Sequence, residues 1–256
     1  MSKRQKFILT SAILSLGMFF VQEIDINFRY LVIFILSGLG IGLTFWSLAE
    51  ALSGISWLTT VILPTLFTAG VGYFYFLLPQ NLLARIVISI LYAVGIYALL
   101  LTENIFSVAA IRTIQLFRAA QAVGFILTLF TFFLITDTIF SLGLNFYDNF
   151  FLVFLFSFPL FIQGLWSINL ENHLSKKIIV YGLFLALAVA QIAVVLSFWP
   201  LTITIRAVGV TTLAYVLLGL IQAEFQERLF KQTIWEYSGI GLIILVILIF
   251  TTSWGG

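Results

Sequence analysis

Long apolar runs, separated by short polar breaks, fill almost the whole of this 256-residue chain. A helix that crosses the hydrocarbon core of a bilayer needs about 20 mainly apolar residues, with a range of roughly 17–25. Nine such runs can be drawn, at Phe7–Gln22, Tyr30–Leu52, Trp57–Leu78, Leu82–Thr102, Ala110–Thr136, Phe150–Ser167, Ile178–Phe198, Leu201–Gln222 and Ser238–Trp254. The pattern predicts an all-α, polytopic transmembrane helix bundle that forms a single domain over residues 1–256.

The sequence predicts either eight or nine spans, because the first apolar run can be interpreted in two ways. The start MSKRQK, followed by FILTSAILSLGMFFV, looks like the opening of a signal peptide. Because no A-x-A-like cleavage site follows, we interpret it as a retained first helix. The eight-span alternative places this segment in the membrane interface. The seventh and eighth runs are separated only by Trp199 and Pro200, which predicts a tight turn.

One of the longer polar breaks, residues 223–237, has an amphipathic pattern of its own. It reads AEFQERLFKQTIWEY and sets apolar residues such as Phe225 and Trp235 among charged ones. This pattern is typical of a helix that lies in the plane of a membrane surface. We therefore expect a short inner-surface amphipathic connector over residues 223–237.

The composition favours lipid as the surrounding medium. The chain is 62% hydrophobic and 9% charged, whereas soluble domains carry about 25% charged residues. A chain this apolar cannot cover a surface that faces water, so its main partner is expected to be the lipid bilayer. A formal net charge of +2 is too small to indicate a nucleic-acid partner.

The placement of lysine and arginine predicts the orientation. With the amino terminus in the cytoplasm, three cationic residues, Arg29, Arg85 and Arg206, fall in or near the outer loops. Nine of the twelve fall on the inner side: Lys3, Arg4, Lys6, Arg112, Arg118, Lys176, Lys177, Arg228 and Lys231. The sequence thus predicts a multi-pass protein of the cell (cytoplasmic) membrane.

The sequence contains few residues and motifs that could support catalysis. The chain has no cysteine and a single histidine, His173, which excludes thiolate and multi-histidine metal sites. It contains neither HExxH nor GxSxG, and no nucleophile–base pair is visible. We expect no cofactor, no metal site and no catalytic residues, and an enzyme is the least favoured class of function.

Polar side chains inside apolar spans are costly and mark candidate functional sites. Arg112, Gln115, Arg118 and Gln121 recur every three residues and form a broad polar face at the start of the fifth predicted span. Guanidinium groups bind phosphate and carboxylate, so this face is a candidate site for an anion or an anionic lipid headgroup. Alternatively the arginines anchor the helix and are neutralised by Glu50 and Glu103 on the same side.

Three further polar residues, Glu50, Gln163 and Gln191, are predicted to lie within the membrane. A GxxxG step from Gly38 to Gly42 predicts close helix packing inside the bundle.

A resemblance adds to this picture. The segment TENIFSVAAIRTIQLFRAAQAVGFILTLFTFFL, from Thr102 to Leu134, resembles a run in uncharacterised multi-spanning membrane proteins of small-genome candidate-phylum bacteria. The resemblance implies a bacterial cytoplasmic membrane. It implies no known activity and identifies no functional residue in this chain.

Two hypotheses for the function stay open. The first is a small transporter or permease-like bundle, or a bundle that binds anionic lipid. It predicts a water-accessible cavity that converges on the arginines or on Gln121, Gln163 or Gln191. The alternative is a non-catalytic structural or assembly partner of another membrane protein or of a second copy. It predicts a dry bundle with an exposed face of small residues.

Overall fold

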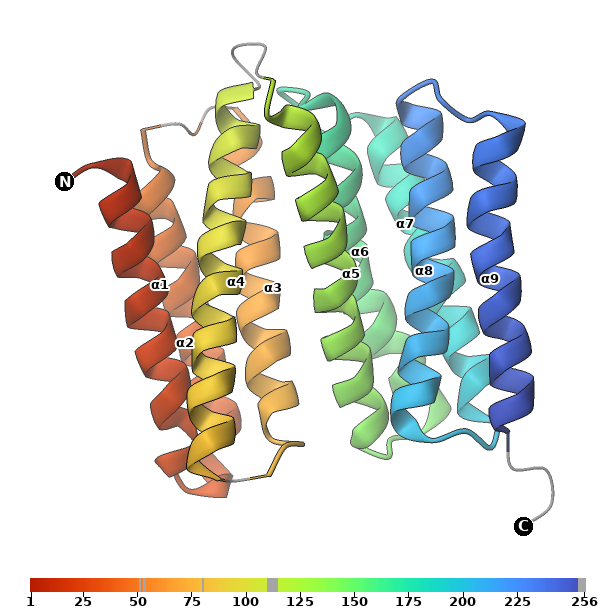
Figure 1. The fold of residues 1–256 in the computed structure, drawn as a ribbon, viewed down its shortest axis with the longest axis horizontal. Coiled ribbons are helices and arrows are strands. Elements are labelled where there is room, and N and C mark those ends of the chain that lie inside the picture. The colour runs from red at the N-terminus through yellow and green to blue at the C-terminus, as the bar shows by residue number, and fades with distance from the viewer. Residues whose placement is uncertain (51, 53, 80, 110–114, 253–256) are drawn as a thin grey trace. The chain divides into compact units, whose positions relative to one another are not determined.

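The computed structural model describes residues 1–256 except residues 51, 53, 80, 110–114 and 253–256. Within the described residues the chain forms nine α-helices, one short 3₁₀ turn and no strands (Figure 1). The elements are α1 (Lys3–Phe20), η1 (Val21–Glu23), α2 (Ile26–Leu48), α3 (Ser56–Tyr75), α4 (Leu82–Ala109), α5 (Phe117–Ser141), α6 (Phe146–Asn169), α7 (Lys176–Ser197), α8 (Ile203–Phe225) and α9 (Lys231–Thr251). All nine helices are long and apolar enough to cross a membrane, which confirms the all-α transmembrane class.

Polar residues just before several apolar runs explain where the helices begin. Ser2 and Gln5 form a capping box at the start of α1, in which each side chain accepts the other residue's backbone N–H. The Ser175 hydroxyl accepts the N–H of Ile178 at the start of α7. Oδ1 of Asn81 accepts the N–H of Ala84 at 2.7 Å at the start of α4. These bonds satisfy amide groups that have no partner within the first turn of a helix.

Several helix ends differ from those expected from the sequence, and buried polar residues explain the differences in α4 and α5. The fourth span was expected to end at Thr102, but α4 continues to Ala109 because Glu103 is fully buried inside the fold. The fifth was expected over residues 110–136, whereas α5 begins at Phe117 and passes Asp137, which is also buried. Polar residues that pack inside the protein do not end a helix.

The expected surface helix over residues 223–237 is not a separate element. Helix α8 continues to Phe225 and α9 begins at Lys231, so most of this segment belongs to two spans. Between them Glu227 has a φ of 56°, and the N–H of Arg228 donates to the carbonyl of Ala223 at 2.8 Å. This bond, five residues back to a helical carbonyl beside a left-handed residue, is the pattern of a Schellman cap. The cap ends α8 and allows α9 to start at once.

The chain divides into two compact units. Unit 1 comprises Met1–Thr131 with Leu170–His173, and unit 2 comprises Phe132–Asn169 with Leu174–Gly256. In unit 1, α1 packs against α2 and α4, while α3 packs against α2 and α4. At its core the Tyr92 hydroxyl lies 2.8 Å from that of Thr68, and the ring of Phe67 stacks on Tyr92. The prediction of a single domain stays a prediction.

In unit 2 the helices with the most extensive mutual packing are α6 and α7. Small residues on α7, Ala186, Ala190 and Ala193, are fully buried, and Gly182 lies against Ile162 of α6. Small side chains at this spacing let two membrane helices approach closely. Helix α8 then packs against α6 and α7, and α9 packs against α8. Of the residues of α9, Leu248 is the one that is buried.

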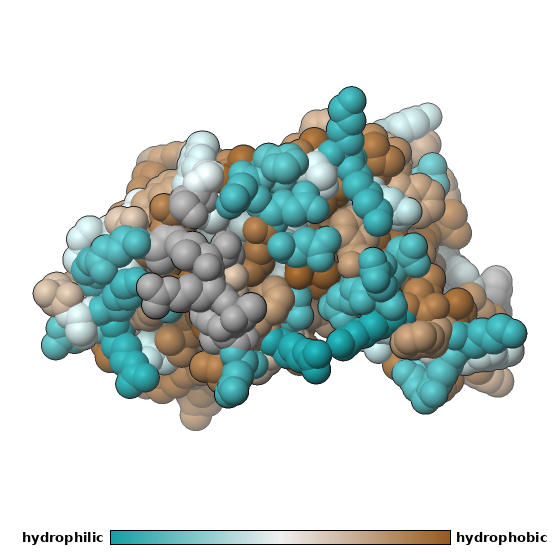
Figure 2. All heavy atoms as spheres, turned by 90° about the horizontal axis from the view of Figure 1, so that it is seen from above, coloured by the Kyte–Doolittle hydropathy of each residue, from teal (hydrophilic) through white to brown (hydrophobic). Residues whose placement is uncertain are grey.

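The exterior of both units suits a lipid environment. Many exposed side chains along the helices are large and apolar, for example Phe34 on α2 and Phe250 on α9. Hydrophilic side chains gather at helix ends, as Figure 2 shows for one end of each unit. This division is the one expected when lipid surrounds the middle of each helix and water meets its ends.

Candidate functional site

The predicted anion-binding face at the start of the fifth span is only partly described. Arg112 lies outside the described residues. Gln115 is exposed and precedes α5, and Arg118 is exposed in the first turn of that helix. Gln121 is half-buried one turn later. Because α5 begins at Phe117, Gln115 does not belong to the same helix as Arg118 and Gln121, and the anion site stays a prediction.

Glu50, which was predicted to lie within the membrane, follows the end of α2 in the structure. Helix α2 ends at Leu48, and the exposed Glu50 carboxylate accepts a hydrogen bond from Nζ of Lys6 at 2.9 Å. This bond and the positive charge of Lys6 lower the pKa of Glu50 below the ordinary range. Within the described part of the chain the carboxylate is therefore engaged by a lysine of α1 and not by Arg118 of α5.

The two predicted intramembrane glutamines lie in different surroundings in unit 2. Gln163 is buried on α6, whereas Gln191 is exposed on α7. Beside Gln163, the carbonyl of Gly164 accepts a hydrogen bond from Nε2 of Gln222 on α8 at 2.9 Å. A third glutamine, not singled out from the sequence, therefore links α6 to α8.

A cluster of polar residues that was not predicted from the sequence surrounds the turn between α7 and α8. Arg206, in the first turn of α8, is half-buried. Its Nη2 donates to the carbonyls of Leu201 at 3.3 Å and Trp199 at 3.5 Å. Its Cζ lies 5.4 Å from the ring centroid of Phe140, within the range of a cation–π contact. These contacts fix the guanidinium beside the turn, and the buried Nε has no hydrogen-bond partner among the described residues.

Asp137 of α5 belongs to the same cluster. The residue is 3% exposed and its side chain is hydrogen-bonded to Thr204 of α8, while its Oδ1 has no hydrogen-bond partner among the described residues. Within the described part of the chain no ion pair joins Asp137 to Arg206. We call Asp137, Trp199, Thr204 and Arg206 the turn cluster. Ionisable groups buried in a membrane span are functional candidates by default.

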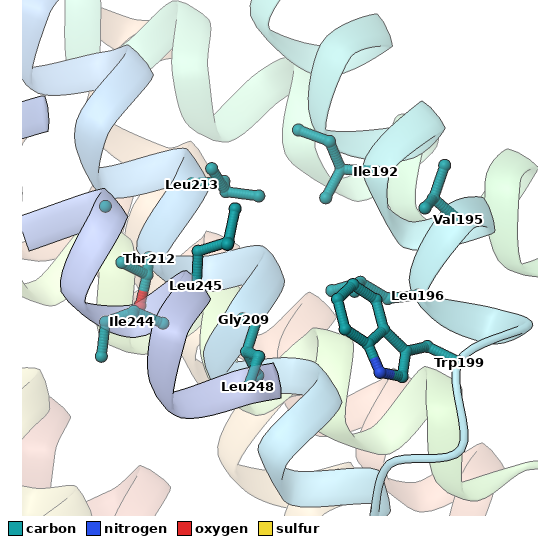
Figure 3. A pocket seen from close by; sticks show the side chains of 11 residues that line it. Ile192, Val195, Leu196, Trp199, Gly209, Thr212, Leu213, Ile244, Leu245 and Leu248 are labelled. Carbon is teal, nitrogen blue, oxygen red and sulfur yellow. The ribbon is translucent and has the colours of Figure 1, made fainter. Parts of the chain in front are cut away.

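An apolar cavity of about 190 Å³ lies between α7, α8 and α9 (Figure 3). Its lining includes Ile192, Leu196, Trp199, Gly209, Leu213 and Leu248. The one hydroxyl in the lining, that of Thr212, donates to the carbonyl of Val208 at 2.9 Å and is satisfied within α8. The interior of the cavity therefore suits hydrocarbon and not a polar solute.

The turn cluster lies at one end of this cavity. On α8, Arg206, Gly209 and Leu213 are spaced i, i+3 and i+7, which puts them on one face of the helix. Trp199 lines the cavity and is also a hydrogen-bond partner of Arg206. Its Nε1 donates to Oγ1 of Thr252, one turn beyond the lining residue Leu248. The site is thus amphipathic, with an apolar chamber and a cationic end.

One feature of the sequence indicates this site. Arg206 stands inside an otherwise apolar predicted span, next to a tight turn that contains Trp199. The cavity itself gave no signal, because it depends on side chains of three helices that meet in space.

Comparison with known proteins places the chain in a family. A family model described as a protein of unknown function (DUF5656) matches residues 9–251. Neither the curated proteins nor the solved structures contain a match to this chain. The matched region runs from α1 to the end of α9, far beyond the segment Thr102–Leu134 that carried the sequence resemblance. This chain is therefore a multi-pass membrane protein that belongs to the DUF5656 family.

Proposed function

We propose that this protein binds a lipid of the surrounding bilayer and holds an acyl chain in the cavity between α7, α8 and α9. The observation that carries the proposal is the apolar lining of that cavity beside a cationic end. At about 190 Å³ the cavity is smaller than the roughly 300–1,000 Å³ typical of small-molecule pockets. It suits part of one hydrocarbon chain.

The cavity is reachable from the lipid side. Val195 and Leu245 line it and are 62% and 49% exposed, so they belong both to the cavity and to the outer surface. Helix α9, which forms one wall, contacts the rest of unit 2 mainly through α8. A lipid chain can therefore enter sideways between α7 and α9 without crossing water.

A permease for polar solutes receives less support. That role predicts a wet cavity near Arg112 and Arg118 or near Gln121, Gln163 or Gln191. Of these residues, those that the structure describes do not line the cavity between α7, α8 and α9. Lipid binding is therefore the form of the first hypothesis that the geometry favours.

Filling the cavity is expected to abolish lipid retention. Ile192→Trp places an indole in the chamber, whereas the matched change Ile179→Trp adds the same ring to the exposed surface of the same helix. After purification and detergent exchange, native mass spectrometry should detect a bound lipid on the wild type and on Ile179→Trp but not on Ile192→Trp. A wild type without lipid, or equal retention by all three proteins, would contradict the proposal.

The orientation belongs to the same proposal. We place the amino terminus in the cytoplasm and the protein in the cell membrane of a bacterium, because nine of the twelve lysines and arginines then face inward. A reporter that is active only in the cytoplasm, fused after Lys177, is expected to be active. A periplasmic reporter active at the same position would reverse the assignment.

A second role is favoured by one observation on α2. A Cβ atom built on Gly38 or Gly42 meets no atom within 4 Å, so the GxxxG step predicted to pack inside the bundle faces open space. An open face of this kind suits a helix of another membrane protein or of a second copy. If this is the main role, Gly38→Ile with Gly42→Ile should abolish association between two differently tagged copies or with the partner, and lipid retention should be incidental.

A further inference from the structure

We infer that the lipid held in the cavity has an anionic headgroup, and that Arg206 binds the phosphate of that headgroup. The inference rests on the proposed lipid binding and names the class of lipid. Arg206 is one helical turn beyond the cavity lining, on the same face of α8 as Gly209 and Leu213. An acyl chain in the chamber therefore brings its polar end toward the guanidinium.

The guanidinium retains donors for a ligand. It has five N–H groups, and its hydrogen bonds to the carbonyls of Trp199 and Leu201 both come from Nη2. Nε also lacks a hydrogen-bond partner among the described residues but is buried, so the donors open to a ligand are those of Nη1. The carbonyls of Trp199 and Leu201 are neutral, so they do not compensate the positive charge of the guanidinium. A phosphate is a strong acceptor that matches the planar fork of an arginine.

The other polar groups at this end are hydrogen-bonded or closed to a headgroup by burial. The Trp199 indole donates to Oγ1 of Thr252 at 2.6 Å, and the Thr252 hydroxyl donates to the carbonyl of Leu248 at 2.6 Å. Asp137 is hydrogen-bonded to Thr204, and its Oδ1 has no partner among the described residues. The residue is only 3% exposed, which closes it to a headgroup ammonium. The accessible charge at the cavity end is therefore positive, and this favours an anionic over a zwitterionic lipid.

The test compares lipids with identical acyl chains. The purified full chain is loaded with equal amounts of phosphatidylglycerol, phosphatidylcholine and phosphatidylethanolamine, and the retained lipids are counted by native mass spectrometry. The wild type should retain phosphatidylglycerol about fivefold over phosphatidylcholine, the ratio that one basic residue near a membrane surface provides. Arg206→Gln should bring the ratio to about one, and Arg206→Lys should keep most of the preference.

A second arginine of the same protein, Arg228, provides the control for this test. Arg228→Gln removes an exposed arginine between α8 and α9, and the ratio should not change. Equal retention of the three lipids by the wild type would overturn the headgroup assignment while lipid binding stands, whereas no retained lipid would overturn both. Stronger retention of phosphatidylethanolamine than of phosphatidylglycerol would also overturn the headgroup assignment, because it would indicate that Asp137 binds the headgroup ammonium. If Arg206→Gln does not fold, the wild-type ratio and Arg206→Lys still decide the question.

Discussion

Replacing Trp166 by alanine is expected to lower the free energy of unfolding by at least about 2 kcal/mol. The side chain is 1% exposed on α6 and is among the largest buried side chains of the protein. In soluble proteins such a truncation costs about 3–5 kcal/mol. Part of that cost reflects transfer from water, which is weak when lipid is the alternative medium. The loss of packing contacts and the cavity left in the protein still destabilise the variant.

The measurement is an SDS titration in mixed micelles, followed by far-ultraviolet circular dichroism. Trp235→Ala is the matched control, because Trp235 is 78% exposed on α9. Its effect should stay within about 0.5 kcal/mol, as for most surface substitutions. Equal effects of the two substitutions would mean that the packing of α6 in unit 2 is not as described.

Replacing Gly219 by leucine is expected to separate α9 from α8. A Cβ atom at this position would overlap the ring of Tyr237, which also packs against Tyr215 at a centroid distance of 5.0 Å. The ring has little room to move aside, so the contact between the helices must open. Overpacking of this kind costs about 1–3 kcal/mol and occasionally more. Protease cleavage in the turn between α8 and α9 should become faster.

The matched control for this prediction is Gly239→Leu on α9. A Cβ atom on Gly239 meets nothing within 4 Å, and leucine favours a helix over glycine by roughly 0.8–1 kcal/mol. The control should therefore leave cleavage unchanged or slow it. Faster cleavage in the control alone, or in neither variant, would show that α9 does not pack on α8 through Gly219.

The helices were predictable because a membrane span leaves a long, continuous signal. Apolar runs placed all nine helices, and the pair Trp199–Pro200 marked the tight turn before α8. The ends were less predictable where a polar residue is buried. Glu103 and Asp137 read as loop residues in the sequence but lie inside α4 and α5, because their surroundings within the fold replace water.

The candidate site was much less predictable. Arg206 could be singled out, since an arginine in an apolar span requires an explanation. Its neighbours could not, because Phe140 is far away in sequence and lies on another helix. The cavity depends on which faces of α7, α8 and α9 meet, and on Gly209 offering no side chain there. Apolar composition alone does not distinguish a face that touches a helix from one that touches lipid.

A photoactivatable phospholipid, retained through detergent exchange and cross-linked to the full chain, locates the bound lipid. The diazirine is placed in the acyl chain, and the labelled residues are identified by mass spectrometry. Lipid binding between α7, α8 and α9 predicts labels concentrated on lining residues such as Ile192, Leu213 and Leu248. Labels spread evenly over exposed residues of every helix, or concentrated on α2 or α4, would contradict it.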